Sequence, residues 1–342
     1  MSIRYDTNYM AEYVSSFITG FQDVVAQDLP NRLKGLKILN LFDGLVHYSY
    51  SGNSRDLESV IYFNNTFFVL KTMKGKGLNF PSLAGVVAKE NKTYLITKGS
   101  FRVRFNQENQ FVKVDKKIAR KAEDTVLRCT KLQLDRLSPS TEIWYAIRRE
   151  GFAYCGQLIS KREFTEKNLN KGELRPEIAY LICCFAELKN DGVVLEPFCG
   201  YGSIPVQLAK KFPFSRLYVS DIDSEKIKMV SEKKQLKDKE NICVNCCDAF
   251  ELKEIADKSV DTVITDPPWG YYEDIGDIND FYSKMFISLK RVLKSDGKMI
   301  ILSARKEELE NSASKMDLII TKSLHTLVNG KKAGLYELKI NN

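Results

Sequence analysis

The stretch Val260-Asp261-Thr262-Val263-Ile264-Thr265-Asp266-Pro267-Pro268-Trp269 decides how we expect this chain to fold. Its first six residues alternate between apolar and polar, a pattern that predicts a buried strand. Two successive prolines have fixed φ and no backbone N–H, so they end the strand and stiffen the turn. A carboxylate and an aromatic ring are thereby presented at the carboxyl end of a strand, where open α/β sheets bind ligands.

The side chains of this turn, the tetrad Asp266-Pro267-Pro268-Trp269, suit a planar exocyclic amine. Asp266 can accept one N–H of the amine, the carbonyl of Pro267 can accept the other, and Trp269 can stack on the ring. The alternative is a structural proline turn with an incidental tryptophan. The four residues alone do not decide between these interpretations, so the rest of the chain must.

Length and composition indicate an ordinary globular protein. The 342 residues suffice for two or three domains, and 44% of them are apolar. No apolar run approaches the ~18 residues of a membrane-spanning helix, and residues 1–6 lack the core of a signal peptide. Eight cysteines without the spacing of a disulfide framework favour a reducing compartment. We therefore expect a cytoplasmic protein that does not bind membranes.

Charge is distributed unevenly along the chain. Residues 1–170 contain 26 Lys and Arg against 17 Asp and Glu, whereas residues 171–342 contain 26 against 27. The basic excess therefore lies entirely in the front half. This distribution is typical of a front half that binds a polyanion and a back half with another task.

In the front half, residues 1–73 predict a ferredoxin-like α+β domain. A helix ends at Pro30, strands cover 37–41, 45–50 and 66–71, and a short helix covers 54–63. His47 lies within a strand and is interpreted as structural. Residues 74–100 are rich in Lys and Gly, and we expect a domain junction there.

A second module follows and ends near residue 160. In the strand from residue 101, apolar side chains alternate with Arg102 and Arg104, so one face is apolar and the other cationic. A helix over 116–131 and two strands over 141–148 and 152–159 complete the module. Phosphates are the expected ligands of its cations, and a solvated face is the alternative. The candidate RNA-binding residues are Arg102, Arg104, Lys117, Arg120, Lys121 and Arg128.

Ser100-Phe101-Arg102-Val103-Arg104, Ile118-Ala119-Arg120 and the final strands together resemble a THUMP domain, an RNA-binding module of RNA-modifying enzymes. The segment from Gly20 to Leu29 is similar to the ferredoxin-like domain that usually precedes it. The resemblance implies that residues 1–73 and 74–160 hold the acceptor stem and 3′ end of a tRNA, while a separate domain carries out the chemistry.

In the back half, a polar linker over 161–173 leads to a helix with Pro176 in its first turn. A strand over 193–195 then runs into Glu196-Pro197-Phe198-Cys199-Gly200-Tyr201-Gly202-Ser203 and a helix. The glycines allow close approach to a ligand, and the helix N-terminus offers free N–H groups. A second strand ends at Asp221-Ile222-Asp223, where an acid can accept both hydroxyls of a ribose. A third precedes Asp248-Ala249, where a carboxylate can meet an adenine amine.

Alternating strands and helices predict a mainly parallel, doubly wound α/β sheet over 174–342, closed by an antiparallel hairpin at Asn329-Gly330. The glycine turn, the two acids and the tetrad, in this order, resemble the Rossmann-like class I S-adenosylmethionine-dependent methyltransferases. With Leu174-Arg175-Pro176, they are similar to the THUMP-containing guanine-N2 methyltransferases. Glu196 replaces the usual Asp, and Tyr201 and Ser203 also depart from the family pattern.

The resemblance implies methyl transfer from S-adenosylmethionine to N2 of a guanine in structured RNA, most naturally tRNA. Its catalytic residues would be the tetrad. The cofactor-binding residues would be Pro176, Glu196, Pro197, Cys199, Gly200, Gly202, Ser203, Asp221, Asp223, Asp248, Ala249 and Asp266.

Several alternatives stay open. The tetrad also serves an adenine N6 or cytosine N4 of ribosomal RNA or DNA, and a non-catalytic RNA-binding assembly protein is the rival outside enzymes. The need for an activating subunit also stays open. Cys243, Cys246 and Cys247 have no second ligand pair, so we predict buried apolar cysteines and no metal site. Cys199 is not needed as a nucleophile, because transfer to an amine is direct.

Overall fold

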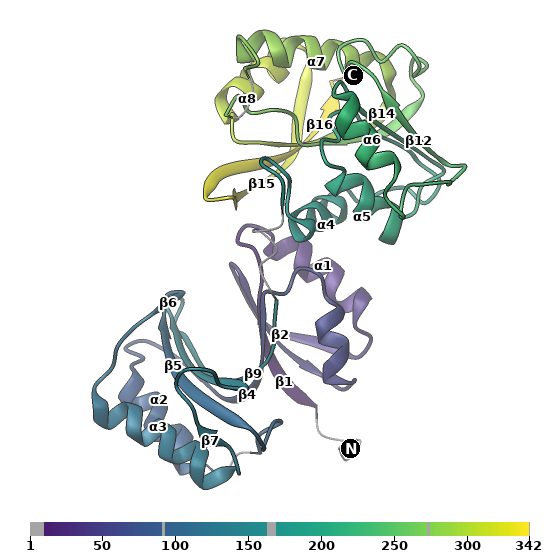
Figure 1. Cartoon of the computed structure of the whole chain (residues 1–342). Helices are drawn as coiled ribbons and strands as arrows, with labels where there is room; N and C mark the ends of the chain where they lie inside the picture. Colours follow the sequence, from purple (N-terminus) through teal and green to yellow (C-terminus); the bar gives the residue numbers. More distant parts are fainter. Residues whose placement is uncertain (1–9, 91–92, 163–168, 272–273, 342) are drawn as a thin grey trace. The chain divides into compact units, whose positions relative to one another are not determined.

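The computed structural model describes residues 10–90, 93–162, 169–271 and 274–341 (Figure 1). The chain forms two compact units. The first comprises residues 1–17 and 25–163, and the second comprises residues 18–24 and 164–342. The predicted linker over 161–173 spans the boundary between them, although its residues 163–168 lie outside the described part of the chain.

A nine-stranded sheet forms the centre of the first unit as the structure describes it. Its order is β2-β3-β1-β4-β9-β8-β5-β6, and β7 pairs with β5. The predicted division of the front half after residue 73 falls at the end of β4, which pairs with β9, and it stays a prediction. The strands are β1 (Ala11–Ser16), β2 (Leu36–Phe42), β3 (Leu45–Tyr50), β4 (Asn65–Lys74), β5 (Ser100–Gln107), β6 (Gln110–Phe111), β7 (Gln133–Leu134), β8 (Thr141–Arg148) and β9 (Phe152–Lys161).

The described helices of this unit are α1 (Gln22–Arg32), α2 (Phe80–Lys89) and α3 (Lys116–Cys129), with a 3-10 helix over Ser54–Ser59. Ala122 and Val126 of α3 share a core with Phe101 and Phe105 of β5, which confirms the predicted apolar face of that strand. Arg102 and Arg104 alternate with these phenylalanines, so their side chains lie on the opposite face of the sheet.

Two predictions for this unit were wrong. Pro30 does not end α1, which continues to Arg32; only one backbone bond is lost, and Leu29 and Leu33 are buried on either side of it. The helix expected over 54–63 is a 3-10 helix that ends at Ser59. Residues 74–100, where we expect a domain junction, contain α2, whose buried side chains recur at helical spacing behind an Asn79 cap. The junction itself stays a prediction.

The second unit contains a seven-stranded sheet among its described residues, in the order β12-β11-β10-β13-β14-β16-β15. The first five strands are parallel, and β16 runs antiparallel to both β14 and β15. This confirms the predicted α/β fold with a terminal hairpin. The strands are β10 (Val193–Glu196), β11 (Arg216–Asp221), β12 (Ile242–Cys246), β13 (Val260–Thr265), β14 (Leu293–Ser303), β15 (Leu318–Val328) and β16 (Lys331–Ile340).

Helices cover both faces of this sheet, as the complete burial of β13 requires. On one face, Tyr282, Met285 and Phe286 of α7 pack on β13 and β14 in a shared core with α8. On the other, α4 packs against α5 (Figure 1). The helices are α4 (Pro176–Phe185), α5 (Ser203–Lys211), α6 (Ser224–Ser231), α7 (Ile278–Val292) and α8 (Lys306–Lys315). No helix in the described ranges is both long enough and apolar enough to cross a bilayer.

Strand order fixes where a ligand can bind. The chain leaves β10 toward β11 on one side, and β13 lies on the other side of β10. The segments after these strands therefore diverge above the carboxyl ends of the sheet. Such a reversal opens a crevice, which is where doubly wound sheets bind their ligands.

Candidate active site

A pocket of about 560 Å³ lies at the carboxyl ends of β10, β11, β12 and β13. The tetrad lines it together with the glycine turn and the acids that follow the other strands. Of the predicted site residues, the pocket brings together Glu196, Pro197, Cys199, Gly200, Ser203, Asp221, Asp223, Asp248, Ala249, Asp266, Pro267, Pro268 and Trp269. Pro176 and Gly202 do not line it; Pro176 starts α4, and Gly202 precedes α5.

The glycine turn after β10 has a left-handed backbone at Gly200 and Gly202, with φ of 50° and 81°. No atom lies within 4 Å of the position that a Cβ on Gly200 would take, so this glycine leaves open space at the pocket wall. A Cβ on Gly202 would lie 3.1 Å from a methyl of Val230. The two glycines therefore act differently: Gly200 allows a ligand to approach, and Gly202 allows α5 to pack against α6.

Asp221, at the end of β11, is buried and joins the glycine turn to the next helix. Its Oδ2 accepts from Gly200 N at 2.7 Å, and its Oδ1 accepts from Asp223 N at 3.0 Å. Each carboxylate oxygen has a second lone pair, so a ribose hydroxyl can still be accepted. Asp223 caps α6 by accepting from Glu225 N and Lys226 N. The bond from Lys226 N, the charge of Lys226 and the bond from Glu225 N all lower the pKa of Asp223.

Glu196 at the end of β10 is the most deeply buried acid of the pocket, at 1% exposure. Its Oε1 accepts from Phe198 N at 3.0 Å and from the hydroxyl of Thr265 at 2.6 Å. Its Oε2 has no hydrogen-bond partner among the described residues. Burial raises the pKa of this carboxyl well above its ordinary value, despite the two donors at Oε1. A donor on a bound ligand would satisfy this oxygen.

Asp248 follows β12, and its Oδ1 accepts from Phe250 N at 2.8 Å. Phe250 and Phe198 both contact Phe281 of α7, with ring centroids 5.3 and 5.7 Å apart. All three rings line the pocket beside the Asp248 carboxylate. An apolar aromatic wall next to a carboxylate suits a planar heterocycle that carries an amino group.

The tetrad begins where β13 ends, as predicted. Burial raises the pKa of Asp266 to about 7. Trp269 Nε1 donates to Leu302 O at 3.4 Å, and Trp269 O accepts from Arg305 Nε at 2.8 Å. These bonds join the turn to β14 and to the segment after it. The turn is therefore held from both its ring and its backbone, and Asp266 lies at its start with a pKa near neutrality.

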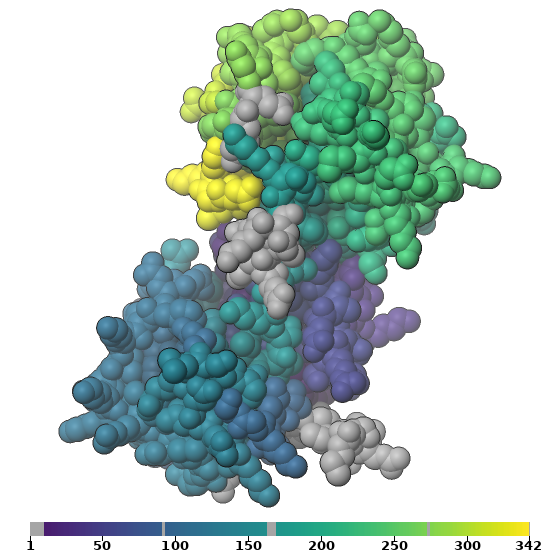
Figure 2. Space-filling model, in the orientation of Figure 1, coloured from purple at the N-terminus to yellow at the C-terminus, as the bar shows by residue number. Residues whose placement is uncertain are grey.

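Some pocket residues were not predicted. Phe198, Phe250 and Phe281 belong to this group, as does Lys226, which forms an ion pair with Asp223 (3.6 Å). The β15–β16 turn supplies Val328, Asn329 and Lys331. The Asn-Gly signal predicted this hairpin, but its place at the pocket follows from the insertion of β16 between β14 and β15, which sequence reasoning did not find. Figure 2 shows the hairpin, in yellow, at the surface of this unit.

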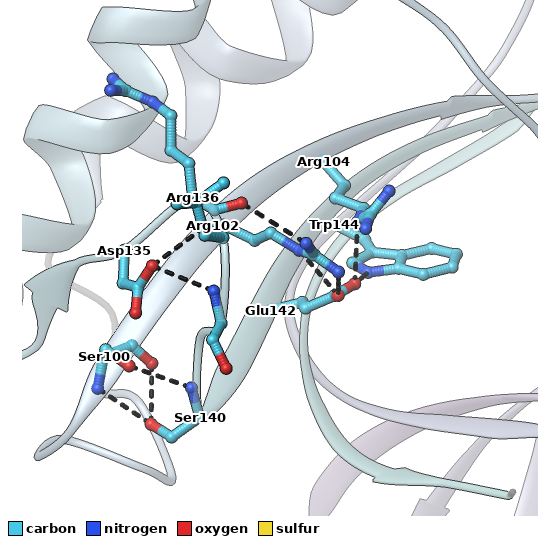
Figure 3. A network of polar contacts seen from close by, with 10 residues as sticks. Ser100, Arg102, Arg104, Asp135, Arg136, Ser140, Glu142 and Trp144 are labelled. Atoms are coloured by element: carbon cyan, nitrogen blue, oxygen red, sulfur yellow. Dashed lines mark hydrogen bonds and ion pairs between the residues drawn. The ribbon is translucent and has the colours of Figure 1, made fainter.

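In the first unit, Arg102 and Arg104 share one carboxylate, that of Glu142 on β8 (Figure 3). Trp144 Nε1 donates to the same group at 2.6 Å. Burial alone would raise the pKa of Glu142, but these donors and cations lower it. Arg104 also lies 4.3 Å above the ring of Phe111. Both arginines are thus partly neutralised within the protein, and their contact with RNA stays a prediction.

The other predicted cations lie together. Lys117, Arg120, Lys121 and Arg128 are exposed side chains of α3 and line one shallow depression with Ala88 of α2. Asp124 is the one acid among its lining residues. This cluster keeps most of its positive charge, and Arg128 is oriented by donating to Ala88 O at 2.6 Å.

The cysteine prediction was wrong in part. Cys246 is exposed, and Cys243 and Cys247 are half-buried. The reason is that β12 is the edge strand of its sheet. Cys199 is buried, and burial raises the pKa of its thiol, so the thiolate is disfavoured. His47 is also buried, and its ring contacts Glu12 and Asn40, which agrees with a structural role.

Known proteins similar to this chain point to one activity class. A family model described as the RMKL-like methyltransferase domain matches residues 162–333. The probable tRNA (guanine(10)-N2)-dimethyltransferase of Methanothermococcus thermolithotrophicus is 30% identical over 156 residues, covering 43% of this chain and 93% of that protein. The tRNA (guanine(6)-N2)-methyltransferase of Thermus thermophilus is 25% identical over 176 residues, covering 50% of this chain and 52% of that protein.

Among solved structures, TrmN from Thermus thermophilus matches with a TM-score of 0.77 and 17% identity, over 96% of this chain and 99% of that one. This likeness shows that the two proteins share a fold. The residues that the family model matches include all those that line the pocket. From the match over residues 162–333, the chain belongs to the family of the RMKL-like methyltransferase domain.

Proposed function

We propose that this protein transfers a methyl group from S-adenosylmethionine to the exocyclic N2 of a guanine in RNA. The observation that carries the proposal is that the tetrad lines the same pocket as the glycine turn, Asp221 and Asp248. An amine-binding turn and the elements of a nucleoside-binding crevice thus face one space. The activities for which the Methanothermococcus and Thermus relatives are named support guanine N2 as the acceptor.

The charge of the pocket fits a cationic cofactor. Seven acids line it against three lysines: Glu173, Glu196, Asp221, Asp223, Asp248, Asp266 and Asp274 against Lys171, Lys226 and Lys331. The acids still outnumber the lysines without Glu196 and Asp266, whose pKa values burial raises. Glu196 Oε2, buried without a partner in the described structure, suits the ammonium group of a methionine moiety. Asp221 would hold the ribose, Asp248 the adenine amine, and the Gly200 turn would lie against the methionine portion. When bound, S-adenosylmethionine supplies a methyl group on a positively charged sulfur.

The tetrad would prepare the amine of the base. The lone pair of a guanine amine is delocalised into the ring, so the nitrogen must become pyramidal before it reacts. Asp266 and the carbonyl of Pro267 would accept the two amine hydrogens in that geometry, and Trp269 would stack on the base. Orientation of this kind supplies ~7–11 kcal/mol of a barrier. Asp266, with its pKa near 7, can receive the proton that the amine loses after methyl transfer.

The basic front half supports an RNA substrate. The exposed cluster on α3, Lys117, Arg120, Lys121 and Arg128, offers four cations to a phosphate backbone. Within this proposal, tRNA is the favoured RNA, with its acceptor stem and 3′ end on the first unit. The proposal of a tRNA substrate includes a cytoplasmic location for the protein. Reconstitution of the reaction with the purified protein alone tests whether an activating subunit is needed.

The proposal is tested by incubating the purified chain with S-adenosylmethionine and total tRNA, then digesting the RNA to nucleosides for mass spectrometry. We expect N2-methylguanosine to accumulate in amounts that depend on the enzyme. N6-methyladenosine or N4-methylcytidine would overturn guanine as the acceptor while retaining the amine chemistry. No methylated nucleoside, despite measurable RNA binding, would favour a non-catalytic binding protein. Ribosomal RNA and DNA serve as competing substrates in the same experiment.

A further inference from the structure

A side-chain hydrogen bond joins the ends of β10 and β13, beyond the last pair of backbone partners. The backbone register of these two strands ends at Leu195 and Val263. Glu196 and Thr265 lie further along, and Thr265 Oγ1 donates to Glu196 Oε1 at 2.6 Å. Both residues are buried. The bond therefore spans the two strands at the point where the segments that follow them diverge.

Glu196 Oε1 joins the two turns that line the pocket. It accepts from Phe198 N, in the segment that leads to the glycine turn, and from Thr265, the residue before Asp266. These two bonds orient the carboxyl group and leave Oε2 without a partner among the residues that the structure describes. Glu196 lines the pocket, whereas Thr265 does not. A ligand in the pocket would therefore contact Glu196, and Thr265 would act on that ligand only through Glu196.

The Thr265 hydroxyl also affects the charge of Glu196. Burial raises the pKa of this carboxyl, whereas the bonds from Thr265 and from Phe198 N lower it. The neighbouring charges of Asp266 and Asp221 raise it further. Without the hydroxyl, the carboxylate would have one donor fewer to offset burial and the two acids. Thr265 thus favours the anionic form of Glu196.

A cationic N–H donor is the ligand group that suits this arrangement. Such a group would satisfy Oε2, and its positive charge would offset the charge of the buried carboxylate. The methionine end of S-adenosylmethionine carries an ammonium of this kind. Resting on the cofactor of the proposed function, we infer that Thr265 is a positioning residue for cofactor binding, whose hydroxyl holds Glu196 with Oε2 available to the ammonium.

The test compares two ligands that differ in the ammonium. S-adenosylhomocysteine and 5′-methylthioadenosine share the adenosine and an uncharged sulfur, but only the first has the amino acid portion. Thr265→Val replaces the hydroxyl by a methyl group. We expect it to weaken S-adenosylhomocysteine binding ~10-fold, as the loss of a hydrogen bond to a charged group implies, and to leave 5′-methylthioadenosine affinity parental. Thr265→Ser keeps the hydroxyl and should retain near-parental affinity for both ligands.

Thr262→Val is the matched control. Thr262 is buried in the same strand and does not line the pocket. This variant should bind both ligands with parental affinity, and thermal unfolding of each variant reports the state of the fold. If Thr265→Val does not fold, Thr265→Ala gives the same comparison with a smaller side chain. Equal weakening of both ligands in a folded Thr265 variant would assign Thr265 a structural role and overturn the inference.

A double-mutant cycle tests whether Thr265 acts through Glu196. Glu196→Gln keeps an acceptor for the Thr265 hydroxyl but removes the negative charge, so it should weaken S-adenosylhomocysteine binding by itself. Adding Thr265→Val should then cost little more, because the group that Thr265 positions is already lost. Additive losses would overturn the inference. A parent chain that binds neither S-adenosylmethionine nor S-adenosylhomocysteine would refute the proposed function, whereas parental affinity in Thr265→Val would refute the inference alone.

Discussion

Gly200 N donates a 2.7 Å hydrogen bond to Asp221 Oδ2, which joins the turn after β10 to the end of β11. The same carboxylate accepts from Asp223 N through its other oxygen. Asp221 therefore has two tasks in our account, since it orders the glycine turn and accepts the ribose. A substitution at this position removes both.

We predict that Asp221→Ala weakens S-adenosylmethionine binding by ~1.5–3 kcal/mol, the range for a hydrogen bond to a charged group. Asp221→Asn should lose less, because its amide oxygen can still accept from Gly200 N. Calorimetric titration of both variants measures the difference. Parental affinity in the Ala variant would remove Asp221 from the cofactor site.

The two glycines of the turn should respond differently to the same substitution. Gly200→Ala and Gly202→Ala both force a side chain into a left-handed backbone, at a cost of ~1–3 kcal/mol. Only Gly202→Ala also brings a Cβ to 3.1 Å from Val230. We therefore expect the larger loss of unfolding free energy for Gly202→Ala, and partial recovery when Val230→Ala is added. Denaturant unfolding of these three variants and the parent tests this, and equal losses at the two glycines would contradict it.

Charge reversal should have different effects in the two groups of front-half cations. Reversing charge at Arg120 and Lys121 should raise the KM for RNA more than it lowers kcat and reduce the salt dependence, because both side chains are exposed. Reversing Arg102 and Arg104 should additionally lower stability, because the buried Glu142 would face two like charges. Salt-dependent RNA binding, read beside thermal unfolding, distinguishes the outcomes. Salt-independent RNA affinity in the parent would count against phosphate recognition by this half.

The pKa of Asp266 predicts the pH dependence of the reaction. Because burial raises this pKa to about 7, the carboxylate that accepts the amine hydrogen is lost as pH falls through 7. The ratio kcat/KM should therefore fall about tenfold per pH unit below that value. Asp266→Asn keeps an uncharged acceptor, so its kcat/KM should be lower but should not show this fall below pH 7. A parental profile that is flat from pH 5.5 to 8.5 would contradict the role of the carboxylate.

The features that the sequence predicted are local signals, whereas those that it missed depend on contacts between residues far apart in the chain. The tetrad, the glycine turn and the acids Asp221 and Asp248 are local signals at strand ends, and parallel strands bring such ends to one edge. The partnership of Arg102 with Glu142 depends on the pairing of β5 with β8 across forty positions, where the two residues face each other in register. Lys331 reaches the pocket only because β16 inserts beside β14. Cys246 is exposed because its strand is at the sheet edge, which no local pattern indicates.

The central claim is that Asp266 and the Pro267 carbonyl act on the amine as it becomes pyramidal, and single-turnover methyl transfer by Asp266→Ala tests it most directly. We predict a rate constant ~10²–10³ lower than the parental one, because one preorganised contact is worth ~2.7–4 kcal/mol, with S-adenosylmethionine affinity nearly unchanged. Trp269→Ala should instead raise the KM for RNA as well as slow the reaction, and Trp269→Phe should retain much of the activity. If Asp266→Ala methylates RNA at the parental rate, the tetrad is a structural turn and the chemistry lies elsewhere.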